Sequence, residues 1–587
     1  VTAAVALLGR NPLAVRLPSF FIGMLTLAAT YDLARVLWGR RAGRWALAVL
    51  AATFWHVHLS RVGFRAVLLP LFTALTLAQL ARGCRTNRRH PWIWAGVLYG
   101  LSWYAYIAAR FTPVALAGMA LYLVWTGRAN ANVRRGWRRF CLAALIVLLP
   151  LGIYTLRHPD VVLQRTGQVS VFDEEINQGD LWGALARHTL RTAGMFVVRG
   201  DRIWRHNLAY RPVFGPALGL MWLIGVGVAL ARSRRDLGAA LALIWTATMA
   251  VPTLLAEDAP HFLRAVGVLP TAALFPTLGL LWLEARLREL TRHPLVRRLP
   301  WALVGLAFAL TAHDYFVAYA KAPLAYHWFE GGPVELAGEI NALRNVGWDG
   351  ARMLHGPPAD RTIYLDRQLW DSWTAVPFVA PESAVRFLPV EAAPPAADSV
   401  AFIVWPYRDW EADVWPHLPH PAYLRVFDGP QAQGDNDPAP FTLAVIIRAD
   451  PRPDAPAPVA RFAEGVILRA ALVAPQHEDG VRVQLYWEAA APLDADYTVF
   501  VHYLRDGEMI AQHDRSPADG HLPTTLWQPG DLVLDVHPLA EITPDPARDQ
   551  LRVGLYRADT GVGLPVVDAA GEPVGDWVTL NVILASE

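Results

Sequence analysis

The sequence predicts a polytopic α-helical membrane domain, followed by a small α/β domain and a C-terminal β-sandwich. The first 320 residues contain about ten apolar stretches of roughly 15–23 residues, about the length that a helix needs to cross a bilayer. Arginine clusters fill every second gap between these stretches, and the chain changes to mixed polarity after Lys321. With 54% hydrophobic residues, the 587-residue chain is also more apolar than most soluble proteins.

The predicted spans share an apolar composition and are separated by charged segments or turns. They lie near 18–37, 45–59, 64–81, 92–109, 112–126, 139–156, 213–231, 236–255, 263–284 and 300–319.

Five arginine clusters occupy alternate gaps between these spans. Because short cytoplasmic loops carry the Lys/Arg excess, all five are predicted to lie on the cytoplasmic side. The connectors 60–63 and 110–111, the loops 157–212 and 256–262, and everything after residue 320 are then external. The clusters are Arg35/Arg40/Arg41/Arg44, Arg82/Arg85/Arg88/Arg89, Arg128/Arg134/Arg135/Arg138/Arg139, Arg232/Arg234/Arg235 and Arg286/Arg288/Arg292/Arg297/Arg298.

The same alternation places residues 1–17 outside, ahead of the first span. A chain of this kind is expected to begin with a helix that carries it across the membrane. We therefore expect an N-terminal span and its first external loop to precede Val1.

The exported half is predicted to contain two domains, so that the chain divides into 1–320, 321–450 and 459–587. An amphipathic helix is predicted over 330–343, and the proline-rich segment 450–458 reads as a stiff linker. Short strand-like runs follow the helix and give the α/β character. They are Thr362–Leu365, Ala384–Leu388, Ser399–Val404, Tyr423–Phe427 and Thr442–Ile447.

Beyond the linker, the runs VRVQLYWEA, DYTVFVHYL, LVLDVH, LRVGLYRA and VTLNVIL alternate with a period of two, which is typical of a β-sandwich. Its aromatic residues Trp487, Phe500, Trp527 and Tyr556 fit core packing better than a carbohydrate-stacking surface. Its aspartates have no recognisable calcium-ligand spacing. They are Asp494, Asp496, Asp506, Asp514 and Asp535.

Three basic side chains gather around the first external connector: His58, Arg61 and Arg65. If this segment is helical, they lie at i, i+3 and i+7 on one face. Three cations at one membrane edge suit a phosphate group, which arginine can bind through two parallel hydrogen bonds. Extension of the same side chains to lipid headgroups is an equally good explanation.

The second external connector contains Tyr106 and Arg110. An interfacial tyrosine is expected in any membrane protein, whereas the positive-inside rule does not favour Arg110 there. Both residues are candidates for contact with a substrate.

The external loop before the span 263–284 carries Glu257, Asp258, His261 and Arg264. Pro260 fits the first turn of a helix, and capping of that helix would be sufficient reason for the two acids. Arg264 lies one turn deeper and needs another explanation.

The long external loop 157–212 contains Asp173-Glu174-Glu175, which could act as a base or hold a metal but is better explained as a solvated turn. The stretch 181–198 could form an amphipathic helix that lies on the membrane. Asp32, inside the first span, is predicted to pair with Arg35 near the cytoplasmic end. Cys84 and Cys141 are not expected to form a disulfide.

Four phrases resemble the GT-C membrane glycosyltransferases, in particular the bacterial form of the protein-mannosyltransferase and aminoarabinose-transferase-like branch. They are LLGRNPLAVRLPSFFIGMLTLAATYDLARVLWGRRAG, FWHVHLSRVGFRAVLLPLF, YAYIAARFTPV and DAPHFLRAVGVLPTAALF. The resemblance covers roughly residues 5–325 and includes the order and topology of the spans.

The resemblance implies a polyprenyl-phosphate-linked sugar as donor, inversion at the anomeric carbon and an active site on the external face. It also implies a catalytic Asp or Asp-Glu pair in the first external loop, ahead of LLGRNPLAVRLPS, so no residue of this sequence receives the catalytic role. Only Arg61, Arg65, Arg110 and Arg264 are carried over, as phosphate- or substrate-facing. Arg65 is followed by Ala66 and Val67, where many relatives have an acidic residue.

The leading interpretation is therefore a multi-pass glycosyltransferase of the bacterial cytoplasmic membrane with extracytoplasmic C-terminal domains. Its acceptor would be a lipid, a protein or a glycan, and nucleic acid is not an expected partner. The alternative is a catalytically incomplete relative that binds lipid-linked sugar or polysaccharide. A transporter or flippase is disfavoured because the unexplained polar groups lie at one membrane face and not at mid-membrane. No metal ligands are assigned, and a divalent cofactor stays open because only some members of such families need one.

Overall fold

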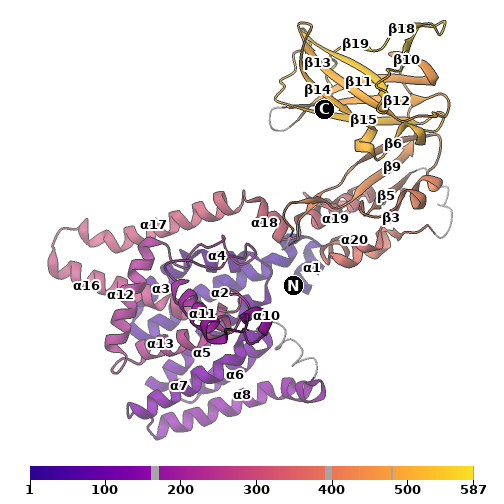
Figure 1. Cartoon of the computed structure of the whole chain (residues 1–587). Helices are drawn as coiled ribbons and strands as arrows, with labels where there is room; N and C mark the ends of the chain where they lie inside the picture. Colours follow the sequence, from indigo (N-terminus) through magenta and orange to yellow (C-terminus); the bar gives the residue numbers. More distant parts are fainter. Residues whose placement is uncertain (87, 160–170, 391–398, 435–436, 477–479, 586–587) are drawn as a thin grey trace. The chain divides into compact units, whose positions relative to one another are not determined.

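The computed structural model describes residues 1–86, 88–159, 171–390, 399–434, 437–476 and 480–585. The chain forms two compact units, Val1–Ala325 and Tyr326–Glu587. The first unit is helical and the second is built mainly from strands (Figure 1). The predicted fold class, a polytopic helical membrane domain followed by a β-rich region, is confirmed.

Among the described residues, seven helical segments are long and apolar enough to cross a membrane, and the apolar helix α12, Pro216–Arg232, is shorter. All of them correspond to predicted spans. The seven are Pro12–Trp38 (α2), Arg65–Arg85 (η1 and α5), Ile107–Trp125 (η2 and α7), Ala131–Arg157 (α8), Leu237–Leu254 (α13 and α14), Val266–Leu290 (η3, α15 and α16) and Val296–Tyr319 (η4, α17 and η5).

The two other predicted spans form shorter helices. The stretch 45–59 is broken at Thr53, whose backbone is extended with φ −93° and ψ 118°. The stretch 92–109 ends its helix early, because Tyr106 is also extended. The resulting elements are α3 (Arg40–Ala51), α4 (Phe54–Arg61) and α6 (His90–Ala105).

The long external loop forms the predicted helix, here α11, Leu181–Gly194. The Asp180 side chain begins it by accepting a hydrogen bond from the Gly183 backbone N–H at 2.9 Å, which is a typical N-cap. Trp182 is 80% exposed, as expected for an apolar face that rests on a membrane. The loop also holds α10 (Glu174–Asn177), and its residues 160–170 lie outside the described part of the chain. The first unit begins with α1 (Thr2–Leu8).

Small residues let the helices of the first unit pack closely. A Cβ on Gly225 of α12 would lie 1.8 Å from the Phe275 carbonyl oxygen, and one on Gly279 of α16 would lie 2.1 Å from the Met221 carbonyl oxygen. Neither position can hold a side chain without separating the two helices. Such glycines are typical of helix contacts in membranes, where close backbone approach replaces the hydrophobic effect.

The second unit contains an eleven-stranded sheet with the order β18-β17-β10-β11-β12-β15-β6-β9-β5-β3-β4. A parallel pairing of β15 with β6 joins the strands of the predicted α/β domain to those of the predicted sandwich. The strands are β3 (Thr362–Leu365), β4 (Arg386–Phe387), β5 (Val400–Val404), β6 (Ala422–Asp428), β9 (Val445–Pro451), β10 (Ala460–Phe462), β11 (Val466–Gln476), β12 (Gly480–Ala489), β15 (Leu532–Ala540), β17 (Val566–Val567) and β18 (Pro573–Gly575).

Short helices and two small sheets complete the α/β part of this unit. The helices are α18 (Pro323–Trp328, which begins at the end of the first unit), α19 (Gly331–Arg344), α20 (Arg367–Ser372), α21 (Ala375–Val379) and α22 (Glu411–Val414). The small sheets pair β1 (Val346–Trp348) with β2 (Met353–His355), and β7 (Gln431–Ala432) with β8 (Phe441–Thr442).

A second, four-stranded sheet forms the other layer of the sandwich. Trp487 and Trp527 are fully buried in the shared core, so the core interpretation of these two aromatic residues is right. Two of the aspartates considered for calcium have separate partners, since Asp506 pairs with Arg548 and Asp535 pairs with His537. The strands are β14 (Glu508–Arg515), β13 (Tyr497–Arg505), β16 (Asp549–Arg557) and β19 (Val578–Asn581).

Candidate functional site

One end of the helical unit is held together by ion pairs of the arginine clusters. Asp32 on α2 accepts hydrogen bonds from Arg35 at 2.7 Å and from Arg82 on α5 at 2.5 Å. The predicted Asp32–Arg35 pair is therefore present, and it also ties two helices together. Nη2 of Arg85 donates to the Leu37 carbonyl oxygen at 2.7 Å in the same region.

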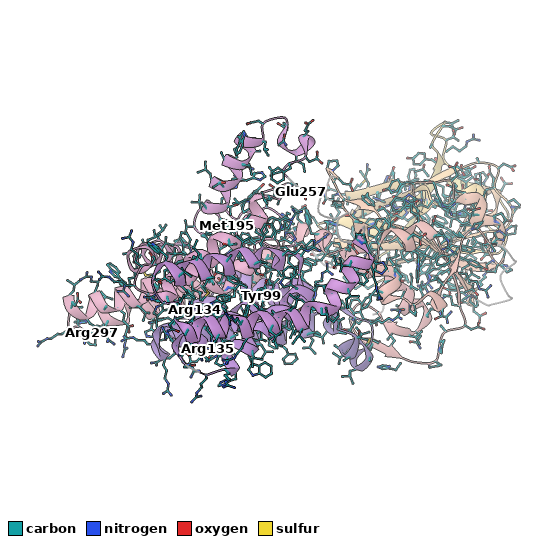
Figure 2. All side chains as sticks on the ribbon, turned by 90° about the horizontal axis from the view of Figure 1, so that it is seen from below. Tyr99, Arg134, Arg135, Met195, Glu257 and Arg297 are labelled. Atoms are coloured by element: carbon teal, nitrogen blue, oxygen red, sulfur yellow. The ribbon has the colours of Figure 1, made fainter. Side chains whose placement is uncertain are left out.

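The remaining arginine clusters lie at the same end of the unit and make similar contacts. Arg41 pairs with Glu284 on α16, and Nη2 of Arg128 donates to the Arg235 carbonyl oxygen at 2.5 Å. Figure 2 shows the labelled arginines of the third and fifth clusters toward this end and Glu257 away from them. Gathering of all five clusters at one end agrees with the alternation of basic loops that predicts the cytoplasmic side.

At the other end, α4 places His58 and Arg61 beside the last helical segment, Val296–Tyr319. His58 is buried, and its Nε2 lies 2.9 Å from the Arg205 carbonyl oxygen. The His58 ring lies 5.1 Å from the ring of Tyr319. The Arg61 guanidinium lies 5.2 Å from the centre of the Tyr315 ring, within the range of a cation–π contact. Arg61 is thus an exposed cation on an aromatic platform.

The continuous helix expected to carry His58, Arg61 and Arg65 on one face does not form. Helix α4 ends at Arg61, and Val62 is extended with ψ 146°. Gly63 then passes so close to Val15 that a Cβ on it would lie 2.6 Å from Cγ1. Because the chain turns here, Arg65 begins a new helical segment and has different neighbours from Arg61.

Arg65 is close enough to Tyr106 to interact with it electrostatically, as is Arg264. These interactions bring the first and second external connectors and the loop before α15 together. Arg65 and Arg110 are exposed, and Arg264 is partly buried. No described contact links Arg110 to this group.

Glu257 and Asp258, the two acids of the loop 256–262, pair with arginine side chains. Oε1 of Glu257 lies 3.8 Å from Nη2 of Arg264, and Asp258 pairs with Arg202. Pro260 lies in a loop several residues ahead of the helical segment Val266–Leu290. The expectation that Pro260 opens a helix capped by the two acids is therefore wrong.

A buried carboxylate that the sequence analysis missed organises this end of the unit. Asp201 has no exposed surface. Its Oδ1 accepts from the Ile203 backbone N–H at 2.8 Å, and its Oδ2 accepts from the Phe262 backbone N–H at 2.7 Å. Asp201 thereby joins the loop 200–211 to the loop 255–265. The only sequence signal is the polar run Asp201–Asn207 just ahead of a predicted span.

Two histidines surround this carboxylate. Nδ1 of His206 lies 3.2 Å from Oδ2 of Asp201, and the rings of His206 and His261 lie 4.7 Å apart. One ligand atom from each of the three residues falls within 4.8 Å of the others, so a divalent cation with nitrogen and oxygen ligands would fit. However, the hydrogen bonds of Asp201 to two backbone N–H groups already give it a structural role.

Burial also sets the charge of His261. It lowers the pKa of His261 from its ordinary value to about 3, with a further lowering from His206. His261 is therefore neutral near pH 7, so one ring nitrogen is free of a proton and can accept a hydrogen bond or bind a metal.

A second missed residue fixes the end of the last helix. Nε of Arg211 donates to Oδ2 of Asp314 at 2.7 Å, and Nη2 donates to Oγ1 of Thr311 at 3.1 Å. The Thr311 hydroxyl in turn donates to the Ala52 carbonyl oxygen at the break between α3 and α4. Burial lowers the pKa of the Arg211 guanidinium, although Asp314 acts in the opposite direction. These contacts hold α4 and its cation Arg61 in place.

The outer end thus carries cations beside aromatic rings and histidines. Contacts run from Arg61 through Tyr315 and Tyr319 to His58, and a second group joins His206, His261 and the backbone N–H of Arg264. Exposed arginines supported in this way can bind an anionic group such as a phosphate ester. Most of the acidic side chains beside them are paired with other arginines or bound to backbone N–H groups.

Comparison with protein families gives one match. Residues 1–154 match the model described as dolichyl-phosphate-mannose-protein mannosyltransferase. This region contains α4 and the first two external connectors, which carry His58, Arg61 and Tyr106. A search among curated proteins finds no match.

Among solved structures, the chain is similar to ArnT from Cupriavidus metallidurans in the apo state, with 14% identity and a TM-score of 0.43 over 76% of this chain and 85% of that chain. It is also similar to the Archaeoglobus fulgidus oligosaccharyltransferase in the apo form, with 10% identity and a TM-score of 0.38 over 98% and 88% of the two chains. A third similarity is to AglB from Archaeoglobus fulgidus in complex with an inhibitory peptide and a dolichol-phosphate, with 11% identity and a TM-score of 0.39 over 98% and 87%.

The phrases that suggested a GT-C resemblance lie largely within the matched region. Residues 1–154 are thus similar to the protein-mannosyltransferase family whose model they match, in agreement with the GT-C resemblance of the same region.

Proposed function

We propose that the helical unit transfers a sugar from a polyprenyl-phosphate donor to an acceptor on the extracytoplasmic face of a bacterial cytoplasmic membrane. The observation that carries this proposal is the cationic outer end within a chain whose first 154 residues match a mannosyltransferase family. The arginine clusters account for the cytoplasmic end, so the outer arginines need a different role. The strand-rich second unit then lies on the same side as the outer end.

In this reaction the bond between the anomeric carbon and the phosphate oxygen breaks, and its electron pair stays with the phosphate. A new bond forms between that carbon and the acceptor oxygen, and the acceptor proton passes to a carboxylate base. Arg61 and Arg264 stabilise the charge that develops on the leaving phosphate, because fixed cations in a partly desolvated site cost no reorganisation at the moment of reaction.

A second candidate function is binding of a lipid-linked sugar without transfer. It is favoured by the pairing of the acidic side chains nearest the cations: Glu257 lies 3.8 Å from Arg264, and Asp258 is bound to Arg202. A carboxylate bound to arginine has fewer lone pairs open to an acceptor hydroxyl.

The two functions are separated by incubating the full chain in nanodiscs with undecaprenyl phosphate that carries mannose, glucose or N-acetylglucosamine. A bacterial membrane extract supplies acceptors, and the release of undecaprenyl phosphate is measured. Release that depends on the chain supports the transferase. Tight donor binding without release supports the second candidate, and absence of binding contradicts both.

The matched variants are Arg264→Ala at the outer end and Arg134→Ala in an exposed cytoplasmic cluster. Loss of one charge-assisted hydrogen bond to phosphate should weaken donor binding roughly tenfold to a hundredfold in Arg264→Ala. Arg134→Ala removes the same charge from the opposite end and should bind as the wild type does. Equal binding by both variants would exclude the role of Arg264.

A further inference from the structure

The second unit has a pocket whose lining combines aromatic rings with acidic and amide side chains. Its cavity of about 170 Å³ is lined by the start of α19, by Trp373 after α20, and by Ala432–Gly434, Asp437 and Phe441. This volume is smaller than the roughly 300–1,000 Å³ of typical small-molecule sites, so it accepts a single sugar ring. Every residue that lines the pocket belongs to the second unit, Tyr326–Glu587. The candidate site around Arg61 and Arg264 contributes no residue to it.

Two aromatic side chains line the pocket, and two further rings lie close to them. Trp373 and Phe441 line the pocket, and the ring of Trp405 lies 5.7 Å from the first and 5.9 Å from the second. Tyr407 extends this group, with its ring 6.1 Å from that of Phe441, and it is 60% exposed. Trp373 and Phe441 are half-buried, and the part of each ring that faces the cavity is a flat apolar surface on which the C–H face of a pyranose can stack.

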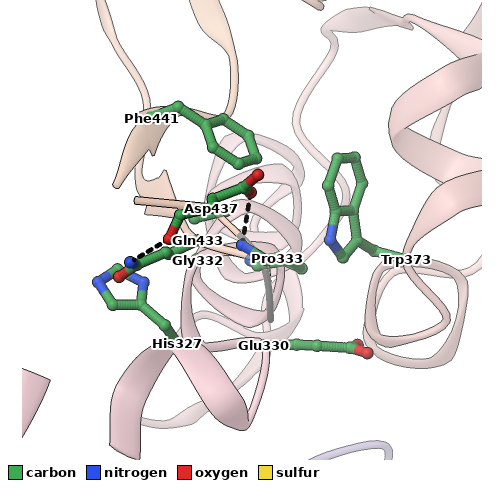
Figure 3. A pocket seen from close by; sticks show the side chains of 11 residues that line it. His327, Glu330, Gly332, Pro333, Trp373, Gln433, Asp437 and Phe441 are labelled. Atoms are coloured by element: carbon green, nitrogen blue, oxygen red, sulfur yellow. Dashed lines mark hydrogen bonds between the residues drawn. The ribbon is translucent and has the colours of Figure 1, made fainter. Parts of the chain in front are cut away.

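Polar groups complete the pocket. Figure 3 shows the Asp437 carboxylate between the Phe441 ring and the Trp373 indole. Oδ2 of Asp437 accepts from the Gly434 backbone N–H at 2.8 Å, and the Asp437 carbonyl oxygen accepts from the Gln433 amide at 2.9 Å. These bonds fix the carboxylate but use only part of its acceptor capacity, because an ionised carboxylate has about four lone-pair sites.

The backbone around the entrance is also unusual. Glu330 has φ 54° and ψ 42°, a left-handed conformation that a non-glycine residue adopts at a cost and that clusters at ligand sites. Gly332 packs against the β7 backbone, since a Cβ there would lie 2.2 Å from the Gln431 carbonyl oxygen. Nδ1 of His327 is buried without a hydrogen-bond partner in the described part of the chain.

We propose that this pocket binds a neutral saccharide, with a sugar ring stacked on Trp373 or Phe441 and its hydroxyl groups donating to Asp437 and Glu330. Two carboxylates in one pocket exclude phosphorylated or uronic sugars by charge repulsion. The site is independent of the proposed transferase, because no donor lipid is needed to fill it.

The test is calorimetric titration of the full chain in nanodiscs, which contain no sugar detergent, with mannotetraose, maltotetraose, cellotetraose and chitotetraose. Saturable binding of at least one of them is expected, and tetragalacturonate should bind at least tenfold more weakly. Absence of binding by all four neutral saccharides, or equal binding of tetragalacturonate, overturns the proposal. Because no donor lipid is present, failure here leaves the transferase proposal untouched.

Trp373→Ala should weaken saccharide binding roughly tenfold, because the stacking face is lost. Trp373→Phe keeps a ring and should restore most of the affinity, which separates stacking from a general loss of structure. The matched control is Trp577→Ala. Trp577 belongs to the sandwich, is 48% exposed and does not line the pocket. Equal affinities of Trp373→Ala and Trp577→Ala would show that the saccharide binds elsewhere and would contradict the assignment.

Discussion

Burial distinguishes two kinds of polar residue at the outer end of the helical unit. Asp201 is completely buried and accepts hydrogen bonds from two backbone N–H groups, whereas Arg61 is exposed over the Tyr315 ring. Buried polar groups have to be paired, so Asp201 is explained by the frame that it holds. Arg61 contacts the rings of Tyr315 and Phe316 while its side chain stays exposed, so the proposed phosphate contact is open to it.

Replacement of Asp201 by Asn is expected to destabilise the helical unit by about 1–3 kcal/mol, because an NH₂ group then faces one of two buried backbone N–H groups. Thermal unfolding of the purified chain in detergent measures this loss. Asp180→Asn is the control, since asparagine caps the N-terminus of α11 nearly as well as aspartate. An unchanged melting temperature for Asp201→Asn would show that Asp201 does not hold the two loops together.

At the scale of elements, the sequence predicted strands with regular alternation but did not predict where helices are interrupted. The period-two runs correctly predicted strands such as β12 and β13, because alternating burial leaves a direct trace in the sequence. The break at Thr53 between α3 and α4 leaves no such trace. It depends on distant partners, such as the Thr311 hydroxyl that binds the Ala52 carbonyl oxygen.

The candidate site was predicted in part for the same reason. Polar residues beside apolar spans were visible, and the structure brings Tyr106, Arg65 and Arg264 together. Asp201 was missed because its partner Phe262 lies 61 residues away. Contacts between loops depend on the packing of the helices that carry them, which a single sequence does not reveal.

The loops 200–211 and 255–265 should separate more readily in acid. Burial lowers the pKa of folded His261 to about 3, whereas an exposed histidine has a pKa of roughly 6.5. The stabilisation is therefore complete above about pH 6.5 and declines as the pH falls toward 3, because only the opened state takes up the proton. Melting temperatures at pH 7 and pH 5 should differ more for the wild type than for His261→Gln. An identical pH dependence would contradict this prediction.

At the scale of the whole molecule, the topology prediction explains the arginines at one end of the helical unit, and the proposed donor binding would explain those at the other. Ion pairs such as Asp32–Arg82 and Arg41–Glu284 use cytoplasmic arginines to join helices. At the other end, Arg61 lies over the Tyr315 ring, and Arg264 pairs with Glu257. The region that matches the family model, residues 1–154, includes Arg61.

The most direct measurement is photo-crosslinking of the full chain in nanodiscs with a benzophenone derivative of undecaprenyl phosphate, followed by mapping of the labelled peptides. We predict that the label falls on the external segments 54–65, 200–211 and 257–264, and that unmodified undecaprenyl phosphate competes with it. Labelling confined to the cytoplasmic arginine clusters, or labelling that undecaprenyl phosphate does not reduce, would contradict a donor site at the outer end.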